Sequence, residues 1–135
     1  MNDFQRDEQH LKQLRLSITE WEFLDELNTA ICTNMHDGKT AIDDIASTMC
    51  IHSSKLRRRV KHDTGITLIS YILHIRMREA IAMLMKYPKQ SITDIAAECG
   101  FADHSHFTHT FKRLFGISPL QYFNDQLKDQ QLQEI

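Results

Sequence analysis

SITDIAAECGFADHSHFTHTFKRLFG, residues 91–116, is the stretch that decides the predicted fold. Ser91 and Asp94 have the spacing of a helix start, in which the serine caps an exposed backbone amide. Gly100 and Gly116 each follow an apolar segment, as glycines do where a helix ends in a left-handed residue. The stretch therefore predicts a short helix, a tight turn and a second, more basic helix.

An earlier segment repeats this pattern. AIDDIASTMCI at 41–51 aligns with SITDIAAECGF at 91–101 with an offset of 50, and 54–65 align with 105–116 with an offset of 51. The small residues Ala46 and Ala96 suit the close crossing of two short helices. Cys50 replaces the turn glycine, and if this position needs a positive φ, holding a non-glycine residue there costs about 1 kcal/mol. Two copies of one helix-turn-helix device are predicted.

The remaining patterns predict an all-α fold, because no stretch alternates with the period of a strand. About seven helices are expected, near 18–36, 41–49, 53–63, 67–86, 91–98, 104–114 and 118–128. The predicted organisation is a flexible N-terminal tail (1–16), a first helix-turn-helix subdomain (17–65), a long linker helix (66–87), a second subdomain (88–128) and a C-terminal tail (129–135). In the first helix, Leu24, Leu27, Ile31 and Met35 form an apolar stripe, which predicts a scaffold role.

The net charge of −2 conceals an uneven distribution. Residues 51–115 hold 11 Lys and Arg against 5 Asp and Glu, whereas residues 1–50 hold 4 against 10. One face can therefore attract an anion although the whole chain cannot. The most apolar stretch, 66–85, carries four ionisable residues, so it predicts a buried helix without membrane contact.

In a helix-turn-helix pair, the second helix enters the DNA major groove with its N-terminal half on the base edges. Leu56 and Val60 should face inward in the first copy, as should Phe107 and Phe111 in the second. The outward residues are then Ser54, Arg57, Arg58, Lys61, His104, Ser105, Thr108, His109 and Lys112, flanked by Lys55 and His106. Arginine can bond guanine O6 and N7, which makes Arg57 and Arg58 candidate readers.

Phosphate contacts are assigned to Lys55, Lys61, Thr108, Lys112 and Arg113. Arg59 is expected to point sideways, toward a phosphate or an acid. A linker of about 20 helical residues spans roughly 30 Å, close to the distance of about 34 Å between successive major grooves on one face. One monomer could therefore read two groove segments on double-stranded DNA.

Residues about 19–125 resemble the DNA-binding domain of AraC/XylS-family bacterial transcription regulators. SITDIAAECGFADHSHFTHTFKRLFGISPLQYF is similar to the family's I-x-x-I-A-x-x-x-G-F and F-x-x-x-F-K-x-x-x-G-x-x-P signatures, and Arg76 and Ala80 match the linker. The resemblance implies a cytoplasmic, nucleoid-associated activator that works through RNA polymerase. It also implies base reading by Ser54, Arg57, Arg58, His104, Ser105, His106 and His109.

The sequence departs from the family pattern in two ways, and each departure leads to a prediction. His52 stands where the family commonly has a capping serine, so the cap is expected to move to Ser53, with a shift of about one residue in the first recognition helix. Most members of the family also carry a sensing or dimerisation domain, and none is expected within these 135 residues. The chain is therefore expected to be either a small stand-alone regulator or the cytoplasmic output domain of a longer one.

Competing functions remain open at this stage. His104, His106 and His109 could form part of a metal-sensing or helical interaction module, since His106 and His109 share a face. Cys32, Cys50 and Cys99 have no paired spacing, so they are expected to be packed small residues in a reducing cytosol, with redox sensing as the alternative. No nucleophile with a base and no phosphate-cradling loop is present in the sequence, so neither an enzyme nor a cofactor is predicted.

Overall fold

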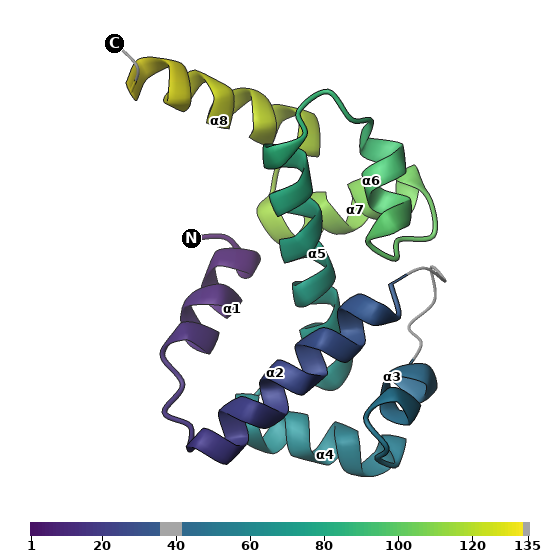
Figure 1. Ribbon diagram of the computed structural model, residues 1–135. Helices are drawn as coiled ribbons and strands as arrows, with labels where there is room; N and C mark the ends of the chain where they lie inside the picture. The colour runs from purple at the N-terminus through teal and green to yellow at the C-terminus, as the bar shows by residue number, and fades with distance from the viewer. Residues whose placement is uncertain (36–41, 134–135) are drawn as a thin grey trace.

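A computed structural model describes residues 1–35 and 42–133, and all regular structure in that part of the chain is helical (Figure 1). The helices are α1 (Asp3–Lys12), α2 (Ile18–Thr33), α3 (Ile42–Thr48), α4 (Ser53–Thr64), α5 (Leu68–Lys86), α6 (Ile92–Glu98), α7 (His104–Phe115) and α8 (Pro119–Gln133). The all-α prediction is confirmed, with one helix more than expected in the described residues.

Helical structure covers part of each segment that was expected to be a tail. Within 1–16, α1 forms behind an N-cap at Asn2, whose side chain accepts from the Gln5 amide while the Gln5 side chain accepts from the Asn2 amide. At the other end, α8 continues to Gln133 instead of ending near residue 128. The sequence around α1 is strongly polar, and its helix was missed because the stabilising contacts come from distant residues.

Local signals place the starts of α2 and α6 correctly. The first of these helices ends at Thr33, before the expected end near residue 36. Ser17 and Ser91 are N-caps whose hydroxyls accept from the amides of Glu20 and Asp94, at 3.2 and 3.1 Å. The first residue of the helix expected near 41–49 lies outside the described residues, and α3 begins at Ile42. Since these caps satisfy amides that a helix start leaves exposed, they fix where each helix begins.

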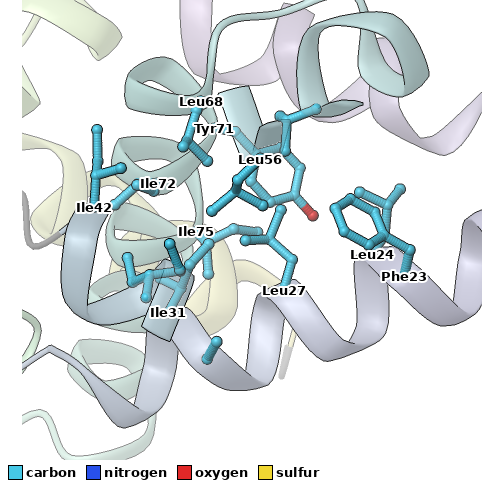
Figure 2. Packing of buried hydrophobic residues seen from close by; sticks show 14 residues of the cluster. Phe23, Leu24, Leu27, Ile31, Ile42, Leu56, Leu68, Tyr71, Ile72 and Ile75 are labelled. Carbon is cyan, nitrogen blue, oxygen red and sulfur yellow. The ribbon is translucent and has the colours of Figure 1, made fainter. Parts of the chain in front are cut away.

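The first apolar core joins α2, α3, α4 and α5 (Figure 2). Leu24, Leu27 and Ile31 of the predicted stripe are buried here, with Leu27 and Ile31 at 0% exposure, in one cluster with Leu56 of α4 and Ile72 of α5. Met35, the fourth residue of the stripe, lies beyond the end of α2 and packs in the second core. Tyr71 of α5 packs in the same cluster, and its hydroxyl donates to Asn28 Oδ1 at 2.5 Å. The first helix-turn-helix unit is therefore held on a scaffold of α2 and α5.

The second core is built on the far half of α5. Met77 and Ala80 meet Ile95 of α6 and the fully buried Phe107 and Phe111 of α7. Both cores contain residues of α5, so this helix is more than a linker. It is a shared spine, because each unit buries its apolar face against a different half of the same helix.

The sequence repeat is also a structural repeat. In each copy, the amide that follows the turn donates to the carbonyl of the small alanine: Ile51 to Ala46 at 3.0 Å, and Phe101 to Ala96 at 2.9 Å. Cys50 has φ 56° and its counterpart Gly100 has φ 86°, which confirms the expected left-handed turn residue in both copies. The same backbone path is therefore followed with and without glycine.

Candidate nucleic-acid interface

Helix α4 exposes the face that the apolar spacing predicted. Leu56 and Val60 are completely buried in the first core. The exposed residues of this helix are Ser54, Lys55, Arg57, Arg58, Lys61 and His62. Since the inward positions are fixed by burial, these side chains project from the unit into solvent.

The N-cap of α4 differs from expectation. His52 itself is the cap, and its Nδ1 accepts from the Ser54 amide at 3.2 Å, so the cap does not move to Ser53. An imidazole nitrogen can replace the serine oxygen because the helix start needs only an acceptor near its free amides. Helices α4 and α7 consequently begin and end 51 residues apart, at Ser53 and His104 and at Thr64 and Phe115. The expected shift of the first recognition helix does not occur.

Arg59 is held sideways, as expected, and its partners are within the protein. Its guanidinium carbon lies 3.8 Å from the centre of the Phe23 ring, and its Nε lies 3.7 Å from a carboxylate oxygen of Asp63. Asp63 is buried, and its other oxygen contacts His62 Nδ1 at 3.0 Å. Arg59 therefore neutralises a buried acid and joins α4 to α2.

Helix α7 presents the second candidate surface. Asp103 caps it by accepting from the His106 amide at 2.7 Å, and Phe107 and Phe111 are fully buried. The exposed residues are His104, Ser105, His106, His109, Lys112 and Arg113. Every predicted base-reading residue of this helix thus reaches solvent.

Two of the candidate readers are restrained by neighbours. Ser54 Oγ lies 2.8 Å from His52 Nδ1. The His106 ring is tilted against Phe101 with 5.7 Å between ring centres, and its Nδ1 accepts from the Ala102 amide at 3.4 Å. With Nδ1 accepting, the proton of a neutral His106 is on Nε2, which leaves a donor for a ligand.

Thr108 is the residue that the structure does not place as predicted. It is only partly exposed, and its hydroxyl oxygen is buried without a hydrogen-bond partner among the described residues. A phosphate contact needs an accessible hydroxyl, so this position does not suit one. Thr108 lies next to the buried Phe107, and the apolar spacing alone did not separate its partly buried position from the exposed arc.

In the described part of the chain, the candidate DNA-contacting lysines and arginines on the two helices are not paired with carboxylates. Among the described residues, no carboxylate forms an ion pair with Lys55, Arg57, Arg58, Lys112 or Arg113. The ammonium group of Lys61 donates to the Gly65 carbonyl at 2.9 Å and stays exposed. An anion that approaches either helix would therefore meet cations that no ion pair neutralises.

The two helices occupy separate places along the spine. Figure 1 shows α4 at the start of α5 and α7 across its other half. In this view both helices run in the same direction, so their N-terminal halves lie on one side of α5. The 19 residues of α5 span about 28 Å at roughly 1.5 Å per residue.

The alternatives raised by the sequence gain no support from the geometry. Within residues 1–35 and 42–133, no three His, Cys, Asp or Glu side chains are grouped so that they could hold a metal ion. Burial raises the pKa of the Cys99 thiol to about 12, and burial together with Glu79 raises that of Cys32. Both thiols are thus kept protonated, which disfavours redox sensing by either residue. No described helix is long and apolar enough to cross a bilayer.

The fold and its paired basic helices define a class of protein with two helix-turn-helix units on one shared spine. A family model described as a helix-turn-helix domain matches residues 45–125. The chain belongs to the AraC-type helix-turn-helix family.

Curated relatives match over part of their length. The transcriptional activator RhaR of Pectobacterium carotovorum is 42% identical over 67 residues, which cover 50% of this chain and 23% of the relative. The activator RhaS of Escherichia coli is 36% identical over 77 residues, covering 57% of this chain and 27% of the relative. The chain thus spans about a quarter of the curated relatives that it matches.

A solved structure supports the same assignment. A transcriptional regulator with an AraC-type DNA-binding domain, from Chromobacterium violaceum, superimposes with a TM-score of 0.65 at 27% identity. The match covers 78% of this chain and 92% of that structure. The likeness therefore extends over more than three quarters of this chain.

Proposed function

We propose that this protein is a sequence-specific DNA-binding transcription regulator that uses α4 and α7 to read two segments of major groove. The observation that carries the proposal is the pair of equivalent helices, 51 residues apart, whose exposed cations have no carboxylate partners among the described residues. Double-stranded DNA is the ligand that matches two parallel cationic helices on one side of a spine. The proposed role is binding, without catalysis.

We assign each exposed residue to base or phosphate contacts by the length and chemistry of its side chain. Arg57 and Arg58 suit bidentate bonds to guanine, and the exposed imidazoles of α7 suit shorter contacts to base edges. The base-reading set is Ser54, Arg57, Arg58, His104, Ser105, His106 and His109. Lys55, Lys61, Lys112 and Arg113 are proposed to contact phosphates and fix the position of each helix on the duplex.

The spine supports binding by a single chain. Its length of about 28 Å is comparable with the repeat of about 34 Å between major grooves on one face of B-DNA. Because α4 and α7 carry different residues, the two half-sites are proposed to differ in sequence. A monomer would then need no twofold symmetry in its target.

We further propose that the protein activates transcription and that RNA polymerase is its second partner. Its proposed location is the cytoplasm, bound to the nucleoid. These proposals are supported by the names of RhaR and RhaS as transcriptional activators. The test is transcription in vitro from a promoter that carries a selected binding site, with and without the protein. Repression or no change in transcript would contradict activation while leaving DNA binding intact.

DNA binding itself is tested by selecting sequences from a random duplex pool and titrating the selected site against salt. Each phosphate contact should contribute about −0.9 to the slope of log affinity against log salt concentration. Four or more contacts therefore predict a slope of about −4 or steeper. A slope near zero, or a pool without enrichment, would refute the proposal.

Substitutions separate readers from phosphate contacts. Arg58→Ala should lose about 1–3 kcal/mol on the selected site and relax preference at one base pair, whereas Lys112→Ala should weaken all sequences alike and flatten the salt slope by about 1. Arg15→Ala is the matched control, because Arg15 is exposed between α1 and α2, outside the proposed interface. Equal losses from Arg58→Ala on every sequence would contradict its role as a reader.

A further inference from the structure

Helix α1 lies outside the segment that matches the family model, and it contacts both helix-turn-helix units. In Figure 1 it runs alongside α5, on the side where α4 and α7 end. One end of α1 packs against the second core through Phe4, and the other packs against the first core through Leu11. It therefore bridges two units that, in residues 1–35 and 42–133, are also joined through α5 and the end of α2.

The contact with the second unit is a three-ring stack. The Phe4 ring lies between His74 of α5 and Phe115, the last residue of α7, with ring centres 4.5 and 4.9 Å away and interplanar angles of 16° and 27°. His74 is buried, and its Nε2 contacts Glu8 Oε2 at 2.5 Å. Phe4 and Glu8, one turn apart on α1, thus both contact His74, through ring stacking and a polar contact.

The contact with the first unit lies at the other end of α1. His10 Nε2 donates to the carbonyl of Thr64, the last residue of α4, at 2.7 Å. Thr64 and Phe115 are equivalent positions of the repeat, 51 residues apart. Helix α1 consequently connects the C-terminal ends of both recognition helices.

This connection depends on both units at once. Helix α1 has 10 residues, and none of them is buried. Isolated helices of fewer than about 12 residues are marginal in water, so α1 persists because its side chains are held at both ends. The same contacts resist any tilt of one unit against the other about the spine, since a tilt would separate Phe4 from Phe115 or His10 from Thr64.

We propose that α1 is a positioning element that holds α4 and α7 in one relative orientation and so sets the half-site spacing that the protein accepts. The DNA part of this inference rests on the proposed function. Two modules joined rigidly at the correct separation bind a matching pair of sites with a high effective concentration, and they discriminate against other separations. Phe4 and Glu8 act through the orientation of the recognition helices and contact no DNA.

The first test measures orientation without DNA. Spin labels on non-natural amino acids replace Ser47 of α3 and Ala97 of α6, which are exposed and outside the proposed interface. Pulsed electron resonance should give one narrow distance distribution for the otherwise unchanged protein and a broad one for Phe4→Ala combined with Glu8→Gln. Gln9→Ala, an exposed change on α1, should leave the distribution narrow, and Phe4→Tyr with Glu8 intact should preserve it because the ring stack remains.

The second test measures affinity on the selected site and on duplexes whose half-sites are moved by one or two base pairs. The unchanged protein should prefer the selected spacing by about tenfold or more. The double variant should bind that spacing about tenfold more weakly, as expected if one-tenth of its molecules hold the competent orientation, and it should lose most of the spacing preference. Circular dichroism at 222 nm checks folding; if the double variant is unfolded, Glu8→Gln alone is compared in both assays.

The outcomes are separable. Unchanged distance distributions in the folded double variant would overturn the positioning role, whether or not DNA binds. A broadened distribution together with an unchanged spacing preference would overturn the link from orientation to spacing. Absence of DNA binding by the unchanged protein would defeat the proposed function, and the label distances would still decide whether α1 fixes the two units.

Discussion

Gly100 at the second turn provides the sharpest test of the fold, because two separate costs can be calculated there. Its φ of 86° lies in the left-handed region, where an alanine costs about 1 kcal/mol. A Cβ at Gly100 would also lie 2.7 Å from the Met35 carbonyl oxygen and 3.0 Å from Arg76 Nε. The backbone of the α2 end would have to move, and such overpacking costs roughly 1–3 kcal/mol more.

Gly116 supplies the matched control for this substitution. It has φ 80° and nothing within 4 Å of the added Cβ, so alanine there carries the backbone cost alone. Gly100→Ala should therefore lower the free energy of unfolding by about 2–4 kcal/mol and Gly116→Ala by about 1 kcal/mol. The entropy that alanine removes from the unfolded chain is shared by both variants and cancels in their difference.

The assay is urea unfolding followed by ellipticity at 222 nm, with the midpoint and slope fitted for each variant. Equal slopes are required, because a changed slope means that the unfolded or folded ensemble differs. A difference of less than about 0.5 kcal/mol between Gly100→Ala and Gly116→Ala would refute the reasoning, given the additivity expected of isolated sites. The close approach of the α2 end to the second turn would then be incorrect.

Three further changes test other parts of the structure. Cys50→Gly should stabilise the fold by up to about 1 kcal/mol in thermal unfolding, because Cys50 is exposed and holds φ 56°; a loss of stability would contradict strain there. Arg59→Ala should cost about 1–2 kcal/mol of stability by leaving the buried Asp63 without its cation, yet should keep the base preference that Arg58→Ala relaxes; altered preference in a binding selection would place Arg59 on DNA. The free energy of unfolding should fall as the pH rises above 9, by about 1–2 kcal/mol at pH 10. Burial raises the folded-state pKa of Cys99 from 9.0 to about 12 and that of Tyr71 from 10.0 to about 12. Both groups therefore ionise first in the unfolded chain, which high pH stabilises. Cys99→Ala should flatten that decline, measured as urea midpoints from pH 8 to pH 10.5, and an unchanged slope would argue against a buried thiol.

Much of the candidate site was predictable from local pattern. The apolar positions at Leu56 and Val60, and at Phe107 and Phe111, recur at helical spacing and are all completely buried. Burial of those four side chains leaves only one face of each helix in solvent, so the arc of candidate readers followed directly. Thr108 shows the limit of this argument, since it lies at the border of the arc and its hydroxyl is buried.

The sequence by itself determined the two helix-turn-helix units, because caps, turn residues and apolar spacing act within about 25 residues of chain. The repeat at offsets of 50 and 51 meant that the helix-turn-helix pattern in one unit supported the same prediction for the other. Only the tertiary structure decided the long-range contacts. Helix α5 is shared between the two cores, and α1 contacts both His74 and Thr64. Arg59 packs on Phe23 and pairs with Asp63. Those contacts link residues up to 66 positions apart, as in Glu8 and His74, and no periodic pattern encodes a pairing between one polar helix and a distant surface.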